Sequence, residues 1–152
     1  MDLKIKHFCE LSPREVYCLM QARSEVFFLE QHITVEDADG VDFEAVHMWL
    51  EHEEQPVALL RIIPPSVTAD GNPSVGRLLV RRPWRRQGLC RRLMCEAIDY
   101  IRHQWGAAPI YISAQSYLVD FYCELGFEVC SEAYEEAGIE HRKMRLQPNM
   151  PR

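Results

Sequence analysis

Apolar and polar residues alternate near both ends of the chain, and helical periodicity follows the first alternating stretch. Residues 3–8 alternate apolar and polar side chains, which predicts a half-buried strand. Ser12, Pro13 and Glu15 have the sequence of a helix start, with the serine as N-cap and the glutamate closing a capping box. We expect this helix to run to about Gln31. Its apolar stripe consists of Val16, Leu19, Met20, Val26 and Phe27.

Two charged residues, Arg23 and Glu30, fall on the apolar stripe of this helix. Such residues either line a pocket or pair at the edge of the core, because unpaired charges are almost never buried. The acidic stretch that follows, residues 36–44, lacks the alternate oxygen ligands and the final glutamate of an EF-hand calcium loop. We expect a loop or a short helix that borders a pocket.

The rest of the pattern predicts short strands and two further helices. Strands alternate with helices in the middle and hairpins occupy both ends, which indicates an α/β fold with a mixed sheet in one domain, residues 1–152. The further strands are predicted at residues 46–50, 56–63, 74–80, 110–113, 127–130 and 139–146, and the helices before Ile101 and at residues 117–125.

The composition describes an ordinary globular chain. Hydrophobic residues at 47% and charged residues at 26% argue against intrinsic disorder. The net charge of −6 argues against nucleic-acid binding, because nucleic-acid-binding domains usually carry a basic face. The six cysteines form no Cys-x-x-Cys pair, and no apolar run has membrane-spanning length. We therefore expect a cytoplasmic protein with reduced thiols, no metal site and no membrane partner.

Seven arginines crowd residues 77–92 of this acidic chain. A predicted strand ends at Val80, the chain turns through Gly88, and a helix begins, so free N–H groups of the first helical turn point into the turn. Glycine there lets a ligand approach the backbone closely. The segment lacks the sequence of a P-loop or of a dinucleotide fingerprint. It is either a cradle for a small polyanion or a solvated, arginine-rich helix start such as a helix-turn-helix fragment.

Two motifs resemble the GNAT acyltransferase superfamily. Val80 followed by residues 85–90, Arg-x-x-Gly-x-Cys, is similar to its acyl-CoA-binding signature, an Arg/Gln-x-x-Gly-x-Gly/Ala turn after a strand. Gln115 with residues 121–127 resembles the second signature, an amide residue followed by Tyr-x-x-x-Gly-Phe. Cys90 departs from the first signature, because glycine or alanine is usual there. The thiol leaves the pyrophosphate somewhat less room.

Further blocks resemble the ElaA-type branch, and the matches cover nearly the whole chain in the same order. They are Arg-x-x-Val-Phe-x-x-Glu-Gln at residues 23–31, Asp39 to Asp42 with His47, residues 114–118 and residues 138–141. The resemblance implies a mixed, mostly antiparallel sheet of about seven strands, flanked by helices. It also implies that the sheet splays in the middle, between the strands that end near Val80 and Ser113.

The resemblance implies acetyl-CoA as cosubstrate, with its pantetheine arm adding to the strand edge at Leu78 and Val80 like another strand. The pyrophosphate is expected in the turn, where Arg85, Arg86 and Arg91 are the arginines expected to bind it. The residues expected to bind the cofactor are Leu78, Leu79, Val80, Arg85, Arg86, Gln87, Gly88, Leu89, Cys90, Arg91, Gln115 and Tyr122.

The chemistry that the resemblance implies is direct transfer to an amine. A backbone N–H polarises the thioester carbonyl, the neutral amine attacks, and Tyr122 protonates the leaving thiolate. Glu30, His47 and His141 are candidate bases, and each is alternatively a paired core carboxylate or a hydrogen-bonded strand histidine. Arg23 and Glu30 are also candidates for a pair that shapes the acceptor pocket.

Cys90 lies at a helix N-terminus among arginines, where the pKa of a thiol is expected to fall. A cysteine nucleophile is nevertheless disfavoured. No His–Asp or His–Asn partner can be assigned to Cys90, and direct transfer needs no acyl-enzyme.

The sequence therefore predicts an acetyl-CoA-dependent N-acetyltransferase that acts on a small amine or a peptide amine in a ternary complex. The acidic loop at residues 36–44 favours a cationic acceptor if it borders the cleft. One alternative is a non-catalytic module that senses acyl-CoA, and another is a nucleic-acid binder that uses the arginine segment. The chain is expected to be a monomer or a homodimer, without a nucleic-acid partner.

Overall fold

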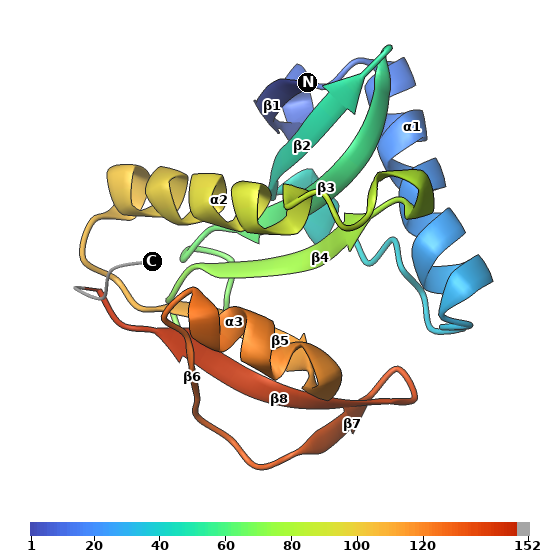
Figure 1. Cartoon of the computed structure of the whole chain (residues 1–152). Helices are drawn as coiled ribbons and strands as arrows, with labels where there is room; N and C mark the ends of the chain where they lie inside the picture. Colours follow the sequence, from blue (N-terminus) through green and yellow to red (C-terminus); the bar gives the residue numbers. More distant parts are fainter. Residues whose placement is uncertain (149–152) are drawn as a thin grey trace.

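Eight strands form one open sheet with helices on both faces (Figure 1). The computed structural model describes residues 1–148. The strand order is β1-β2-β3-β4-β5-β8-β6, β7 also pairs with β8, and all pairs are antiparallel except β4 with β5. The strands are β1 Asp2–His7, β2 Val46–His52, β3 Gln55–Ile63, β4 Ser74–Val80, β5 Ile110–Gln115, β6 Glu128–Val129, β7 Tyr134–Glu136 and β8 Ile139–Leu146.

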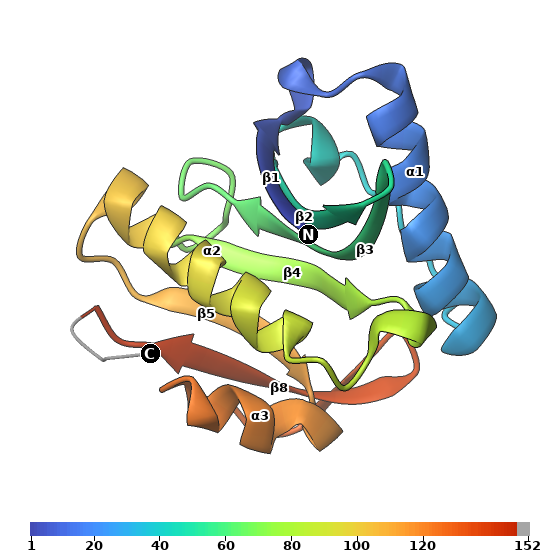
Figure 2. The same ribbon diagram turned by 45° about the horizontal axis from the view of Figure 1, so that its top comes forward.

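The helices cover both faces of this sheet. They are α1 Pro13–Arg23, the π-helix η2 Ser24–Glu30, α2 Leu89–Trp105 and α3 Val119–Glu124, with 3-10 turns at Phe8–Glu10, Val41–Phe43, Arg82–Trp84 and Ser116–Leu118. Alternation along β2 and β3 produces two cores, because successive strand residues point to opposite faces. Met48 and Leu60 pack with the apolar side of α2, which crosses β4 in Figure 2, whereas Trp49 and Leu59 pack with α1.

The first helix begins as its sequence predicts and ends differently. Glu15 N donates to Ser12 Oγ at 3.1 Å, and Ser12 N donates to Glu15 Oε1 at 2.9 Å, which completes the capping box. The helical segment extends to Glu30, close to the predicted end, but its last seven residues form a π-helix. π-Helical segments are rare in proteins, and many of those that occur lie at functional sites.

β4 and β5 pair only where they begin and then part. Ser74 pairs with Tyr111 and Val75 with Ile112, and no further pair joins these strands within the described residues. The rest of β4, to Val80, therefore has an edge without a strand partner. The predicted splay in the middle of the sheet is confirmed.

β4 also contains a bulge on the side where it pairs with β3. Arg61 pairs with Gly76 and Leu59 with Leu79, so two residues of β4, Arg77 and Leu78, lie opposite the single residue between Leu59 and Arg61. Arg77 has a φ of 55°, in the left-handed region. The bulge therefore lies directly after the point where β4 leaves β5.

The end of the chain departs from the sequence-based expectation. Two strands were expected after the helix at residues 117–125, but three are present, because β7 lies between β6 and β8. β7 has three residues, too few to show an alternating pattern. The expected mixed, mostly antiparallel sheet is confirmed, with eight strands in place of about seven.

Candidate active site

The unpaired edge of β4 is the first part of the site. Arg81 N–H donates to the Val57 carbonyl of β3 at 2.9 Å. The carbonyl and N–H of one trans peptide group point in opposite directions, so the Val80 carbonyl points away from β3, toward the gap. This carbonyl accepts a hydrogen bond from Arg85 Nε at 2.8 Å. The edge thus presents backbone groups to the gap, and Arg85 contacts its last carbonyl.

The start of α2 is the second part. Its first intrahelical bond runs from Arg92 N to Gly88 O at 3.1 Å, and no side chain caps the helix. The N–H groups of residues 89–91 therefore have no acceptor in the first turn. Gly88 has a φ of 74° and Arg86 a φ of 63°, so the backbone bends sharply here. The turn presents several N–H donors and the positive end of a helix dipole to one place, which favours an anion.

The arginines expected to bind phosphate differ in their present partners. Arg85 Nη2 donates to Glu30 Oε2 at 2.8 Å, and Arg91 Nη2 donates to Glu124 Oε2 at 2.5 Å. Arg86 is exposed and makes no ion pair with a carboxylate of the described chain. Arg86 is therefore the most available of the three, whereas the other two are shared with carboxylates.

Tyr122 approaches this region from α3. Its side chain is buried, with 7% exposure, and packs edge-on against the rings of Phe121 and Phe127. Burial raises the pKa of Tyr122 far above its ordinary value, and the neighbouring Cys90 and Tyr117 raise it further. Tyr122 therefore keeps its proton at physiological pH and can act as a proton donor.

Cys90 corrects one expectation. Burial raises the pKa of the Cys90 thiol to about 11, so the prediction of a lowered pKa is wrong. Desolvation of a thiolate outweighs the favourable field at the start of α2. The thiol is protonated near neutral pH, which adds to the case against a cysteine nucleophile.

The end of β5 faces β4 across the gap. Gln115 is three residues beyond the last β4–β5 pair, at the end of β5, just as Leu78 is three residues beyond it on β4. Gln115 Nε2 donates to Gln31 Oε1 at 3.1 Å. Gln115 Oε1 and the Ser116 hydroxyl are buried and have no hydrogen-bond partner within residues 1–148. Such atoms are rare in folded proteins. Ser116 was not predicted, although it follows Gln115 directly.

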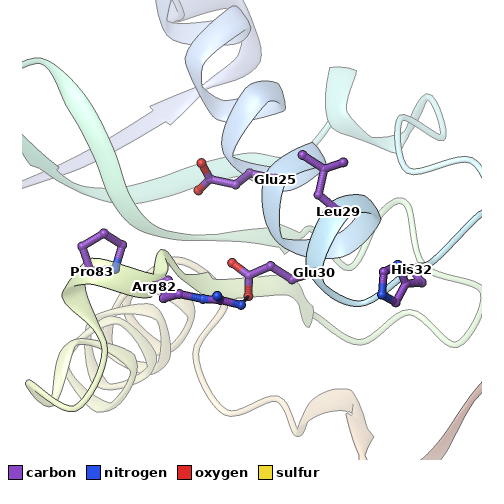
Figure 3. A pocket seen from close by; sticks show the side chains of 6 residues that line it. All are labelled: Glu25, Leu29, Glu30, His32, Arg82 and Pro83. Carbon is purple, nitrogen blue, oxygen red and sulfur yellow. Dashed lines mark ion pairs between the residues drawn. The ribbon is translucent and has the colours of Figure 1, made fainter.

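An open cavity of about 540 Å³ lies between η2 and the turn after β4 (Figure 3). Glu30 points into this space beside Arg82, with Oε2 at 3.6 Å from Arg82 Nη2. The cavity thus brings the predicted catalytic residue Glu30 next to the arginine turn. Its lining residues are Glu25, Leu29, Glu30, His32, Arg82 and Pro83.

Comparison with known proteins agrees with this geometry. A family model described as Acetyltransferase (GNAT) domain matches residues 20–148. The chain belongs to the GNAT acetyltransferase family. Protein ElaA of Escherichia coli K12 is 35% identical over 138 residues, which are 89% of each chain. The ElaA-type resemblance is therefore confirmed.

Solved structures of GNAT relatives superpose closely. The crystal structure of an acyl-CoA N-acyltransferase from Pseudomonas aeruginosa has a TM-score of 0.91 at 33% identity, and the match covers 96% of this chain and 99% of that chain. The crystal structure of Escherichia coli ElaA has a TM-score of 0.88 at 30% identity, with the same coverage of 96% and 99%. This GNAT fold supports transferase activity.

The residues of this GNAT protein fit coenzyme A, which the family implies. A Cβ built on Gly88 meets no described atom within 4 Å, so the turn has free space where a phosphate can approach the backbone. The N–H groups of residues 89–91 and the charge of Arg86 match a pyrophosphate. On β5 and directly after it, Gln115 and Ser116 each have a buried polar atom without a partner in the described chain, which leaves hydrogen-bonding capacity near the end of that strand.

The two candidate histidines lie on different strands. His47 is on β2, with β3 between it and β4, and its Nε2 donates to the Asp42 carbonyl at 2.9 Å. Burial lowers the pKa of His47. His141 is on β8 opposite Gln115, and its Nδ1 lies 2.7 Å from the Ile139 carbonyl. The structure therefore does not bring His47 to the gap, whereas His141 lies one strand from it.

The suggested pair of Arg23 with Glu30 is wrong. Arg23 is 2% exposed, and its guanidinium lies 2.7 Å from Asp42 Oδ1 and 2.9 Å from Asp37 Oδ2. Glu30 binds Arg85 instead. Of the two alternatives for Arg23 and Glu30, Arg23 is paired, with aspartates of the loop, and Glu30 both pairs with Arg85 and lines the cavity.

The three aspartates of the acidic loop are paired with arginines from other elements. They contact three arginines from α1, β3 and β4, which the sequence did not predict because the partners are 14 to 40 residues apart. The charge of these aspartates is therefore engaged, whereas Glu36 and Glu44 of the same loop are exposed, and a preference for a cationic acceptor stays a prediction. The pairs are Asp37 with Arg23 and Arg77, Asp39 with Arg61 and Arg77, and Asp42 with Arg23 and Arg61.

Within residues 1–148, no group of His, Cys, Asp and Glu side chains is arranged to hold a metal ion. No helix of that part of the chain is both long and apolar enough to cross a bilayer.

Proposed function

We propose that this GNAT protein is an acetyl-CoA-dependent N-acetyltransferase that acts on a primary amine of a small molecule or a peptide. Transfer occurs by direct attack in a ternary complex. The observation that carries the proposal is that the unpaired edge of β4 leads, through one turn, to the uncapped start of α2. A chain of amide groups that ends in a pyrophosphate needs this combination of a strand edge and an anion site.

The cofactor contacts follow from the direction of each group. Leu78 and Val80 offer backbone groups of β4, while the side chain of Leu79 packs in the core beneath α1. Residues 86–91 form the pyrophosphate site, with backbone N–H groups and Arg86 as its donors. Arg85 and Arg91 add charge from either side, in competition with Glu30 and Glu124.

Acetyl-CoA supplies an acyl group activated as a thioester. The amine nitrogen forms a bond to the acyl carbon, the carbon–sulfur bond breaks, and Tyr122 gives its proton to the departing thiolate. A backbone N–H of the bulged part of β4 polarises the acyl carbonyl. The raised pKa keeps the Tyr122 hydroxyl protonated before the sulfur leaves, and it also makes this hydroxyl a weaker acid than an ordinary tyrosine.

The proton of the attacking amine needs an acceptor. We assign this role to Glu30. Arg85 donates to both the Glu30 carboxylate and the Val80 carbonyl, so Glu30 lies close to the end of β4. His47 is separated from β4 by β3, and His141 by β5. A water-mediated path from His141 is the competing assignment, and Glu30→Gln with unchanged kcat would favour it.

Two measurements test the proposal. Isothermal titration calorimetry with coenzyme A should show binding at one site per chain. When the protein is mixed with acetyl-CoA and an amine that it accepts, a thiol reagent should detect the release of free coenzyme A. Calorimetry without heat of binding would contradict the whole proposal. Binding without thiol release, across a broad panel of small amines and lysine or N-terminal peptides, would indicate an acyl-CoA sensor.

A further inference from the structure

Two irregular backbone segments occur close to the gap. β4 bulges at Arg77, whose φ of 55° is unusual for a residue with a side chain, and α1 becomes the π-helix η2 directly after Arg23. Bulges and π-helical segments are less favourable than regular strands and helices and persist where contacts hold them in place. The contacts of these two arginines are therefore informative.

One aspartate binds both arginines. Asp37 Oδ1 accepts from Arg77 Nε at 2.8 Å, and Asp37 Oδ2 accepts from Arg23 Nε at 2.9 Å. The Asp37 backbone carbonyl accepts from the Nη2 of each arginine at 3.0 Å. Asp37 thus joins the last residue of α1 to the bulge of β4 with four hydrogen bonds, two to each guanidinium.

The electrostatics explain why this carboxylate matters. Burial and the neighbouring charges of Arg61 and Arg23 lower the pKa of Arg77, while Asp37 and Asp39 act in the opposite direction. The arginines therefore repel one another, and the carboxylates hold them together. Asp39 pairs more closely with Arg61 than with Arg77: its Oδ2 lies 2.7 Å from Arg61 Nη2 and 3.4 Å from Arg77 Nη2. Asp37 is consequently the main anchor of Arg77.

We infer that Asp37 is a positioning residue for acyl transfer, which rests on the function proposed above. Asp37 fixes the bulge, and the bulge sets the direction of the backbone groups of Leu78 that face the gap. Through Arg23 it fixes the same strand relative to η2, which carries Glu30. Asp37 thereby keeps a fixed distance between the backbone of the bulge, which polarises the acyl carbonyl, and Glu30, which receives the amine proton.

The test separates this role from general stability. Asp37→Asn should lower kcat by about 10- to 100-fold, since small misplacements of reacting groups have such effects. The dissociation constant of coenzyme A should change less than about twofold, because the pyrophosphate site lies after the bulge. Amide hydrogen exchange of residues 76–79 should become faster. Arg77→Lys keeps the charge but loses the fork that reaches Asp37 Oδ1 and the Asp37 backbone carbonyl, so it should reproduce these changes.

Asp39→Asn is the matched control from the same loop. It removes the ion pair with Arg61 and should lower the free energy of unfolding, but leave kcat within about threefold because Asp37 still holds Arg77. Equal loss of kcat in both variants, or unchanged exchange at residues 76–79 in Asp37→Asn and Arg77→Lys, would overturn the inference. Failure of the proposed function looks different, because the wild-type protein would then release no thiol with any amine.

Discussion

Arg85 Nη2 lies 2.8 Å from Glu30 Oε2, so the carboxylate of η2 holds the first arginine of the anion-binding turn. The same guanidinium donates to the Val80 carbonyl through Nε. A phosphate and the carboxylate therefore compete for Arg85. Under the proposed function, this single side chain couples cofactor binding to the surroundings of Glu30.

Removal of the competing charge should strengthen cofactor binding. Glu30→Gln is expected to lower the dissociation constant of coenzyme A about two- to fivefold, which corresponds to the loss of a partly exposed ion pair. The same change should lower kcat, because Glu30 is the proposed acceptor of the amine proton. Calorimetry and steady-state kinetics measure the two effects separately. Glu128→Gln, which removes a similar contact with Arg145 on β8, should change neither quantity.

Gly88→Ala tests whether the turn before α2 binds coenzyme A, and the same substitution at Gly71 is the control. Gly88 and Gly71 both have a φ of 74° and open space around a built Cβ. Each alanine variant should lose about 1–2 kcal/mol in the free energy of unfolding, because an L side chain is strained in this region. Only Gly88→Ala should also weaken coenzyme A binding, by roughly tenfold, since its methyl group enters the anion site. Equal affinities in both variants would remove the turn from the site.

The Cys90 thiol should react slowly with alkylating reagents, although it lies at the start of α2. With its pKa raised to about 11, the thiol carries little thiolate at pH 8, so alkylation of Cys90 should be about 100-fold slower than that of an ordinary exposed cysteine. Cys9 and Cys123 are exposed and serve as internal references. Mass spectrometry of peptides after timed alkylation measures all three. Cys90→Ala should retain turnover, and loss of turnover would revive a nucleophilic cysteine.

Local pattern and long-range contacts differ in how well the sequence predicts them. The capping box at Ser12, the strand before Val80 and the glycine turn depend on neighbours in the chain, and all were predicted. The partner of Arg23 was not, because Asp37 and Asp42 approach it only after the loop folds back over α1. Periodicity placed Arg23 on a buried stripe without indicating which carboxylate it meets.

Desolvation is the other quantity that the sequence does not show. The start of α2 suggested a lowered pKa for Cys90, because dipole and arginine charges can be inferred from the sequence. The burial that reverses the shift depends on how the rest of the fold packs around the thiol, near Tyr122. Burial also raises the pKa of Tyr122, a shift that the sequence did not reveal; it keeps the hydroxyl protonated but makes it a weaker acid.

Tyr122→Phe should separate chemistry from binding. Loss of the hydroxyl is expected to lower kcat by about 100-fold, within the usual range for a general acid, while coenzyme A affinity stays within about twofold. The raised pKa of Tyr122 means that the wild-type kcat should show no alkaline decline from this group below about pH 10. Tyr100→Phe, on α2 beside Trp105, is the control and should leave kcat unchanged. An unchanged kcat in Tyr122→Phe would refute the acid role.

The ion pairs beneath the loop should make the protein sensitive to acid. The Arg61 hydrogen bonds hold the pKa of Asp39 below the ordinary value of 3.8. For Asp42, burial alone would raise the pKa, but Arg23 and Arg61 outweigh it and the net shift is downward. Groups with lowered carboxyl pKa stabilise the fold above the unfolded value and lose that contribution as pH falls. The free energy of unfolding should therefore drop steeply below about pH 4.

His47 should add a shallower decline at higher pH. Burial lowers its pKa below 6.5, so the unfolded chain binds this proton more readily and stability falls as pH drops below that value. Urea unfolding at a series of pH values measures both phases. His47→Gln keeps a donor for the Asp42 carbonyl and should remove the upper phase, whereas Asp42→Asn should cost about 3 kcal/mol at pH 7 because two arginines lose a partner. A free energy of unfolding that is constant from pH 7 to pH 3 would contradict both assignments.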